Sequence, residues 1–264
     1  MAPSREVAQR LIADRVVLVA GTLADKPSRQ VLTSDAIELL APPPLYVSRA
    51  GGKLEGALDQ FGLDPAGLVC LDAGSSTGGF TDCLLQRGAR RVIAVDVGTH
   101  QLHEKIRVDE RVEVREQTDI RRLTIEDLGA PVDLIVADLS FISLRLALDG
   151  LVRLVRAQGP LVLLIKPQFE AGRQEASRGR GIISDPAIWQ RVLGEVADAA
   201  QVTGAAMLEL MVSPVPGTSG NIEFVGRFQK GAPPLSEREL GFAMGAAVAE
   251  ASRVQALLTT GAMA

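Results

Sequence analysis

The feature that most constrains the fold is an apolar run at 68–71 that ends in Asp72 and leads directly into a glycine-rich turn. The turn, residues 73–79, reads AGSSTGG, and a helical pattern begins immediately after it. A strand, a glycine-rich turn and a helix N-terminus in this order form a binding cradle at the carboxyl end of a parallel strand. Because glycine has no Cβ, the backbone of such a turn can approach a bound molecule closely. The chain is therefore predicted to contain a doubly wound α/β domain with a small-molecule site at this turn.

The spacing of the glycines indicates which kind of molecule the turn binds. The pattern is Asp-x-Gly-x-x-x-Gly-Gly, whereas a pyrophosphate binder has G-x-G-x-x-G. The carboxylate of Asp72 repels phosphate and favours a cationic ligand. S-adenosylmethionine (SAM) carries a sulfonium and an ammonium group and no phosphate, so it fits. Asp96 ends the next apolar run, where an acid can bind the ribose hydroxyls of the cofactor. The alternative is an ordinary strand–helix turn whose strand ends in Asp.

Strand-like and helix-like segments alternate along the main part of the chain, as they do in folds with a parallel sheet. Strands are expected at 68–72, 91–96, 111–115, 132–138 and 160–165, and helices at 78–87, 142–157 and 186–202. Two last strands, 205–212 and 221–228, are joined without a helix, so they should pair antiparallel. Five parallel strands followed by such a hairpin form the seven-stranded, Rossmann-like sheet of class I SAM-dependent methyltransferases.

Composition shifts divide the chain into four segments. A small module at 1–41 precedes a linker at 42–47 that opens with three prolines, which make it stiff. The main domain covers 48–230, and an Ala-rich, helical tail covers 231–264.

The charge balance restricts how the chain can contact nucleic acid. A formal charge of −4 and a pI near 5.4 argue against indiscriminate coating of nucleic acid. Residues 1–53 nevertheless hold seven Lys and Arg against five Asp and Glu. Aromatic residues are only 3% of the chain, so RNA contacts should use phosphates and shape rather than base stacking. The candidate RNA-binding residues are Arg5, Arg15, Lys26, Arg29 and Arg49.

Apolar segments and cysteines indicate the compartment. No apolar run approaches the roughly 20 residues of a membrane-spanning helix, and no secretory signal is visible. Cys70 and Cys83 fall in the expected strand and helix of the cradle. We expect both to be buried free thiols, which is typical of proteins in a reducing compartment. We expect a cytoplasmic protein without a membrane segment or a metal site.

Four polar residues stand where a methyltransferase sheet presents its active site. Asp138 and Lys166 end the fourth and fifth strands, Glu223 lies on the last strand, and Lys53 precedes the first. Simpler interpretations are available. Lys166 could be a solvated lysine at a strand end, Glu223 an outward-facing strand residue, and Lys53 the start of an amphipathic helix. The carboxyl ends of parallel strands share one edge, however, so Asp138 and Lys166 should converge beside the cradle.

The neighbouring residues exclude two methylation chemistries. Residues 138–141 read DLSF and lack the prolines common in enzymes that methylate exocyclic base amines. Carbon methylation of cytosine needs a thiolate, and neither cysteine stands at this edge. A set of two lysines and two carboxylates suits a ribose 2′-hydroxyl, which must lose its proton as the methyl group arrives. Lys166 could orient that hydroxyl or accept its proton, with Asp138 and Glu223 holding the lysines.

Taken together, these motifs resemble the TlyA family, whose members join an S4 RNA-binding module to an FtsJ/RrmJ-like ribose methyltransferase. The resemblance covers residues 4–230 and rests on SRAGGKL at 48–54, DAGSSTGGFT at 72–81, DLSFIS at 138–143 and KPQFE at 166–170. It implies 2′-O-methylation of cytidine in ribosomal RNA of the small subunit, the large subunit or both, with ribosomal subunits as partners. The family also carries the name hemolysin.

The resemblance also implies roles for single residues. Lys53, Asp138, Lys166 and Glu223 match the catalytic tetrad of the family. The implied SAM-contacting residues are Asp72, Gly74, Ser75, Ser76, Thr77, Gly78, Gly79, Phe80, Asp96, Val97, Asp119 and Asp138.

Three positions depart from the family pattern. The S4-like module begins at Ser4, without the first helix that the family has. Trp189 stands where relatives often have His, and the tail beyond Gly231 has no recognised counterpart. Two other functions stay open from the sequence: a membrane-lytic hemolysin, and a catalytically silent protein that binds RNA or the ribosome.

Overall fold

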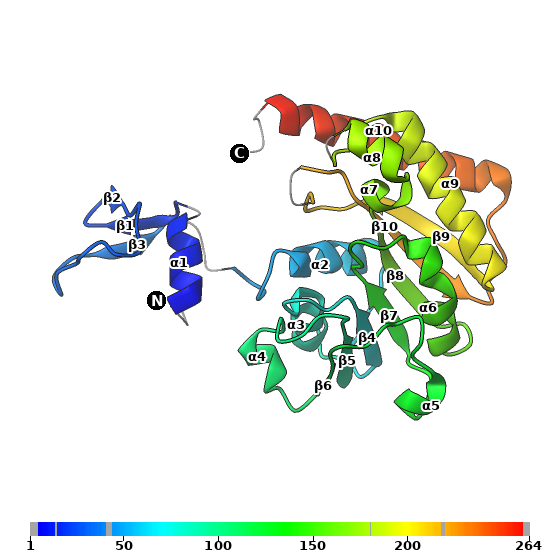
Figure 1. Cartoon of the computed structure of the whole chain (residues 1–264), viewed down its shortest axis with the longest axis horizontal. Coiled ribbons are helices and arrows are strands. Elements are labelled where there is room, and N and C mark those ends of the chain that lie inside the picture. Colours follow the sequence, from blue (N-terminus) through cyan, green and yellow to red (C-terminus); the bar gives the residue numbers. More distant parts are fainter. Residues whose placement is uncertain (1–4, 14, 41–43, 180, 218–219, 261–264) are drawn as a thin grey trace. The chain divides into compact units, whose positions relative to one another are not determined.

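The computed structural model describes residues 5–13, 15–40, 44–179, 181–217 and 220–260 (Figure 1). The chain forms two compact units, Met1–Leu45 and Tyr46–Ala264, and each has a hydrophobic core of its own. Parts of the expected segments lie outside the described residues: 1–4, 14 and 41 of the module, 42 and 43 of the linker, 180, 218 and 219 of the main domain, and 261–264 of the tail.

The first unit combines one helix with a small antiparallel sheet. Helix α1 (Arg5–Ala13) precedes strands β1 (Val17–Val19), β2 (Thr22–Leu23) and β3 (Ile37–Leu39), which pair in the order β2-β1-β3. The buried core of this unit consists of Leu11, Val17, Val19 and Ala24. The assignment of this unit as an S4-like module stays a prediction.

The second unit is built on a seven-stranded sheet with the order β6-β5-β4-β7-β8-β10-β9. Its strands are β4 (Val69–Ala73), β5 (Arg91–Val95), β6 (Val112–Arg115), β7 (Leu134–Ala137), β8 (Pro160–Ile165), β9 (Ala205–Val212) and β10 (Phe224–Lys230). The first five pair parallel, and β10 pairs antiparallel with both β8 and β9. The predicted fold class, a mostly parallel sheet that ends in an antiparallel hairpin, is confirmed.

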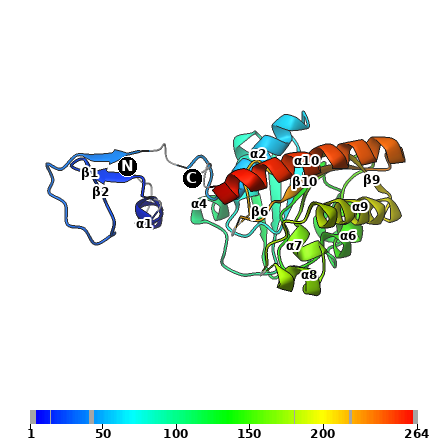
Figure 2. The same cartoon turned by 90° about the horizontal axis from the view of Figure 1, so that it is seen from above.

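Helices cover both faces of this sheet. They are α2 (Ala50–Gln60), α3 (Gly79–Gln86), α4 (Glu104–Arg107), α5 (Ile125–Leu128), the 3-10 helix η1 (Leu144–Leu146), α6 (Leu148–Leu154), α7 (Pro167–Glu170), α8 (Arg173–Arg178), α9 (Pro186–Val202) and α10 (Glu237–Thr260). Seen from above, α2 lies on one side of the sheet and α6 and α9 on the other (Figure 2). Helix α3 packs into the same hydrophobic core as α2. Among the described residues, no helix is both long and apolar enough to cross a bilayer.

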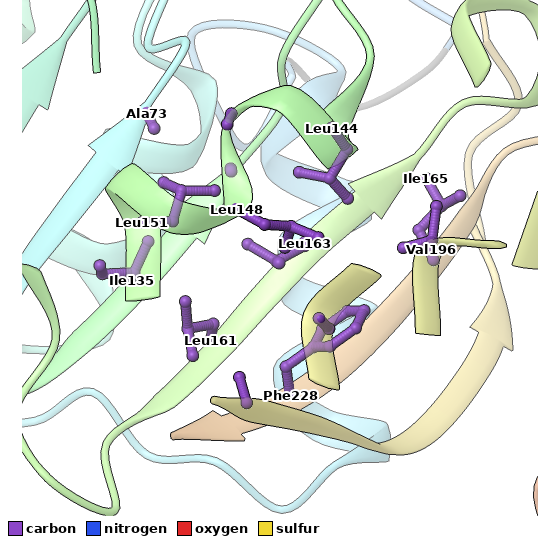
Figure 3. Close-up of a cluster of buried hydrophobic side chains, with 14 of the residues drawn as sticks. Ala73, Ile135, Leu144, Leu148, Leu151, Leu161, Leu163, Ile165, Val196 and Phe228 are labelled. Carbon is purple, nitrogen blue, oxygen red and sulfur yellow. The ribbon is translucent and has the colours of Figure 1, made fainter. Parts of the chain in front are cut away.

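The alternating direction of side chains along each strand explains why there is a hydrophobic core on both faces of the sheet. On β8, Leu161, Leu163 and Ile165 belong to the core under α6 and α9, whereas Val162 and Leu164 belong to the core under α2 and α3. Successive side chains of a strand point to opposite faces, and a parallel sheet covered on both faces needs apolar residues on both. Figure 3 shows Leu161 and Leu163 within the first of these cores.

Several elements differ from their expected bounds, and three of these differences are explained by nearby residues. The helix expected at 142–157 is divided into η1 and α6 and ends at Leu154, because Val155 pairs with Val132 in an isolated β-bridge. The helix expected at 78–87 begins at Gly79, since Gly78 has a left-handed φ of 93°. The last strand begins at Phe224, so Glu223 precedes the strand on which it was expected.

The Ala-rich tail forms α10, which packs against β9 and α9 within the second unit. Ala247 and Ala251 are the residues of this helix that are buried. The small side chains let the helix approach the sheet edge closely.

Candidate active site

Two adjoining cavities open at the carboxyl edge of the sheet. The first, of about 270 Å³, is lined by the lysines and carboxylates expected to be catalytic together with the glycine-rich turn. The second, of about 600 Å³, lies beside the ends of β5 and β7. Gly74, Ser76, Asp138 and Ser140 line both, so the cavities form one continuous cleft.

The glycine-rich turn runs from the end of β4 to the start of α3. Gly74 has a φ of 80°, and a Cβ built on it would lie 2.7 Å from the backbone oxygen of Asp138. A Cβ on Gly79 would collide with Ser48. The turn therefore has room for backbone only at these two positions, as a tight ligand cradle requires. The expected cofactor residues that line the first cavity are Gly74, Ser75, Ser76, Thr77, Gly79 and Phe80.

Asp72, the second-last residue of β4, lies just before the cradle and is completely buried. Its Oδ2 accepts a hydrogen bond from Thr81 Oγ1 at 2.7 Å, whereas Oδ1 has no hydrogen-bond partner among the described residues. The pKa of Asp72 is raised to about 7, mainly by burial and also by the negative charges of Asp138 and Asp96, against the lowering effect of the hydrogen bonds from Thr81. Neither Asp72 nor Gly78 lines either of these two cavities, although both were expected to contact the cofactor.

The second cavity contains the other expected cofactor residues, Asp96, Val97 and Asp119. The carboxylate of Asp96 accepts hydrogen bonds from the backbone nitrogens of Ser76 (2.8 Å) and Gly98 (2.7 Å), which fix its orientation. Asp119 pairs with Arg121 Nη2 at 2.6 Å, and this hydrogen bond lowers the pKa of Asp119. Asp96 is thus a preoriented acceptor, whereas Asp119 is already engaged by an arginine.

The four residues expected to be catalytic lie together in the first cavity, although they come from four different elements. Lys53 Nζ lies 2.6 Å from Glu223 Oε2 and 3.9 Å from Asp138 Oδ2. Lys166 Nζ lies 2.5 Å from Asp138 Oδ1 in an ion pair. Lys53, Lys166 and Glu223 are all less than 10% exposed: 8%, 7% and 4%. The simpler interpretation of Lys166 as a solvated strand end is therefore wrong.

Several residues around this cluster were not assigned a role from the sequence, although they stand within its motifs. Ser140 Oγ accepts a hydrogen bond from Lys166 Nζ at 2.9 Å and lines both cavities. Phe141 is 92% exposed, and its ring centroid lies 5.6 Å from that of Phe169. The left-handed φ of 65° at Phe141 marks a strained loop. The aromatic content of 3% did not predict this contact between Phe141 and Phe169.

The basic residues expected to contact RNA differ in how their side chains are used. The guanidinium of Arg29 donates to the backbone oxygens of Val19, Thr22 and Leu23, so it holds the β1–β2 hairpin of the first unit. Arg5, Arg15 and Lys26 are exposed residues of the same unit. Arg49 is exposed at the N-terminus of α2 and lines the first cavity.

Two further findings concern metals and thiols. Among the described residues, no group of three or more His, Cys, Asp or Glu side chains is arranged to hold a metal ion. Cys70 and Cys83 are both buried, free thiols.

Comparison with known proteins identifies the family of the second unit. Residues 46–230 match the family model described as FtsJ-like methyltransferase. The chain belongs to the FtsJ-like methyltransferase family. This match covers the sheet, the glycine-rich turn and all four residues of the charged cluster.

Curated relatives cover most of the chain. It is 44% identical to the 16S/23S rRNA (cytidine-2′-O)-methyltransferase TlyA of Mycobacterium tuberculosis over 225 residues. The matched region covers 85% of this chain and 84% of that protein. It is 38% identical to Hemolysin A of Brachyspira hyodysenteriae, over 85% and 93% of the two chains. The expected membership of the TlyA family is therefore confirmed, and the same relatives account for the name hemolysin.

Solved structures support the fold. A Streptococcus thermophilus protein that carries the name hemolysin is 37% identical and superimposes with a TM-score of 0.79, covering 96% of this chain and 92% of its own. A Listeria monocytogenes protein described as a SAM-dependent methyltransferase is only 16% identical, with a TM-score of 0.51 over 69% and 99% of the chains. The second likeness concerns the fold alone, which is that of SAM-dependent methyltransferases.

Proposed function

We propose that this protein transfers a methyl group from SAM to a ribose 2′-hydroxyl in ribosomal RNA, and that the ribose belongs to a cytidine of 16S rRNA, 23S rRNA or both. The proposal is carried by two lysine–carboxylate contacts, Lys53–Glu223 and Asp138–Lys166, which lie beside the glycine-rich turn. The printed names of the curated relatives support the substrate. Because ribosomal RNA is cytoplasmic in bacteria, we place the reaction there.

The residues of the cleft fit SAM as the methyl donor, whose sulfonium supplies the methyl group when it is bound. Gly74 and Gly79 line the cleft at positions where a side chain would collide with Asp138 and Ser48, so only glycine allows this shape of the turn. Asp72, with one buried oxygen that lacks a partner, contributes negative potential that favours a cation nearby. In this proposal Asp96, whose orientation is fixed by two backbone N–H groups, accepts hydrogen bonds from the ribose of the cofactor.

The charged cluster would position and deprotonate the target hydroxyl. Lys166, acting as a neutral amine, would accept a hydrogen bond from the 2′-hydroxyl and take its proton while the oxygen bonds to the methyl carbon and the carbon–sulfur bond of the donor breaks. Asp138 and Ser140 fix the Lys166 amine, and Glu223 fixes Lys53. Three of these charged groups are buried, so they are held in place before the substrate arrives, and the remaining rate enhancement comes from alignment of the two reactants.

We also propose that Arg5, Arg15 and Lys26 of the first unit, and Arg49 beside the cleft, contact RNA phosphates. These side chains are exposed and form no ion pair with a described residue. The proposal leaves out Arg29, whose guanidinium is engaged by backbone oxygens.

The decisive experiment replaces Lys166. Lys166→Ala removes the proposed proton acceptor, so methyl transfer to ribosomal RNA should fall by about 10²–10⁴-fold while calorimetric SAM affinity stays within a few-fold of wild type. Lys230→Ala is the matched control, because Lys230 Nζ contacts the backbone oxygens of Val155 and Arg153 outside the cleft. Turnover retained by the Lys166 variant would end the catalytic assignment.

The nucleotide can be identified in cells. Mass spectrometry of ribosomal RNA from cells with and without this gene should show the loss of 2′-O-methylcytidine at one or more positions. If every ribose methyl group is still present, the proposed substrate is wrong.

A further inference from the structure

Glu170, the last residue of α7, is a buried carboxylate that lines neither cavity of the cleft. Its side chain accepts three hydrogen bonds from a loop that lies elsewhere in the sequence: from Ser143 Oγ (2.5 Å), the backbone nitrogen of Leu144 (2.5 Å) and Arg145 Nε (3.2 Å). Arg145 Nη2 donates in addition to the backbone oxygen of Glu170 at 3.0 Å. A buried carboxylate with this many donors is held firmly, and it holds its donors in turn.

The two segments joined by Glu170 are those that carry the Asp138–Lys166 pair. Lys166 caps the N-terminus of α7, and Glu170 ends this single helical turn. Asp138 and Ser140 begin the loop that ends at Ser143. The Lys166 amine lies 2.5 Å from Asp138 and 2.9 Å from Ser140. Glu170 therefore links the two loops directly behind the contacts that they make in the cleft.

The β7–η1 loop needs such support because its conformation is unfavourable on its own. Phe141, in the middle of the loop, has a φ of 65°, which costs energy for a residue with a side chain. Without the carboxylate, the Leu144 N–H would be left buried without a partner. Arg145 extends the support to α9, where its Nη1 lies 2.7 Å from Glu195 Oε2.

We propose that Glu170 is a positioning residue for the methyl-transfer reaction: it sets the contact of Lys166 with Asp138 and Ser140 by fixing the β7–η1 loop to α7. The inference rests on the proposed function of the cleft. It also makes a claim that needs no turnover, namely that Glu170 restrains Lys166 and not Lys53, which Glu223 holds from the other side.

Competitive labelling of lysines, read by mass spectrometry, tests the restraint itself. In Glu170→Gln, Lys166 should label several-fold faster than in wild type, while Lys53 in the same sample should be unchanged. Equal rates for Lys166 in the two proteins would overturn the inference. Faster labelling of both lysines would overturn it as well, since that is general loosening.

Kinetics test the consequence for the reaction. Glu170→Gln should lower kcat at least tenfold and change KM for RNA less than threefold, whereas Arg191→Gln, at the outer end of the same ion-pair network, should leave both unchanged. In a Lys166→Ala background, Glu170→Gln should cause no further loss, because it acts through Lys166. An equal loss in both backgrounds would indicate a merely structural role and contradict the inference.

Two outcomes need separate handling. If Glu170→Gln does not fold, Arg145→Lys tests the same link, since it keeps the charge and removes the forked contact; it should raise Lys166 labelling in the same selective way. If the wild-type protein methylates no RNA, the proposed function fails, and the labelling result still decides the role of Glu170.

Discussion

At the scale of single residues, Asp72 shows most clearly how the site departs from an ordinary protein interior. A carboxylate without exposure and with one unpartnered oxygen destabilises the fold when it is ionised. Asp138 and Asp96 add to the local negative potential. A cation bound in the cleft would offset this cost, so the unfavourable residue stands where a sulfonium would benefit from it.

The first prediction concerns the pH dependence of stability. In the unfolded chain Asp72 ionises near pH 4, whereas in the folded protein its pKa is about 7. Between these values the unfolded state binds fewer protons than the folded state, so the free energy of unfolding should fall as pH rises from about 4 to 7. Asp72→Asn removes this dependence and should raise the free energy of unfolding at pH 8 by up to about 4 kcal/mol.

Urea denaturation at pH 5 and pH 8 measures this difference. Asp198→Asn is the control, because Asp198 is exposed on α9 and the same substitution there should leave the pH dependence as it is in wild type. The prediction is contradicted if Asp72→Asn and wild type lose the same free energy between the two pH values.

The sequence predicted the charged residues of the cleft better than their supports. Asp138 and Lys166 could be found because both directly follow buried parallel strands, which end at one edge of the sheet. Ser140 and Glu170 stand within the motifs at 138–143 and 166–170, but their roles could not be predicted, since a serine in a loop and a glutamate on a short helix are usually solvated. Their roles depend on contacts between segments that only the folded chain brings together.

At the scale of elements, the strand–turn–helix unit at β4 and α3 depends on glycine for two separate reasons. Gly74 adopts a left-handed φ of 80°, and it also lies against the backbone of Asp138, where a Cβ would come within 2.7 Å of the oxygen. The turn and the β7–η1 loop are therefore in direct contact. A change in one should displace the other.

The second prediction separates the effect of the left-handed φ of Gly74 from the effect of its contact with Asp138. Gly74→Ala should destabilise the protein by about 1–3 kcal/mol and weaken SAM binding, because the loop that begins at Asp138 must move. Gly129→Ala is the matched control: its φ of 79° imposes the same strain, and its added Cβ meets no atom within 4 Å. Calorimetry should show reduced SAM affinity for the first variant only. Equal affinities would mean that the contact with Asp138 is unimportant.

Element boundaries were predictable where the signals were local. Helix α9 has the predicted bounds, Pro186–Val202, because Asp185 caps it through the Ala187 nitrogen and proline suits its first turn. The division between η1 and α6 could not be predicted, since the bonds of Glu170 and the bridge of Val155 are tertiary. Trp189, which we expected to depart from the family pattern, packs edge-on to Phe224 and donates its indole N–H to the Ile183 oxygen at 3.0 Å.

At the scale of the whole molecule, the tail is continuous with the second unit rather than an appendage. Ala251 of α10 is completely buried, whereas Ala249 on the same helix is exposed. The sequence predicted the helix and left its packing open, because an Ala-rich stretch shows no strong apolar stripe.

The third prediction uses this pair of alanines. Ala251→Leu should overpack the contact of α10 with β9 and α9, cost about 1–3 kcal/mol and lower the melting temperature of the methyltransferase unit by several degrees. Ala249→Leu should leave the melting temperature within about one degree of wild type, since surface substitutions have small effects. Thermal unfolding followed by circular dichroism measures both. Equal melting temperatures would show that α10 does not contribute to the stability of this unit.

The position of β10 in the sheet has a consequence for the timing of assembly. Among the strands that the structure describes, β10 comes last in the sequence, yet it lies between β8 and β9, and Glu223 directly precedes it. Lys53 thus pairs with a residue that lies 170 positions later in the sequence. The contact between Lys53 and Glu223 therefore forms only after the residues that lead into β10 have been synthesised.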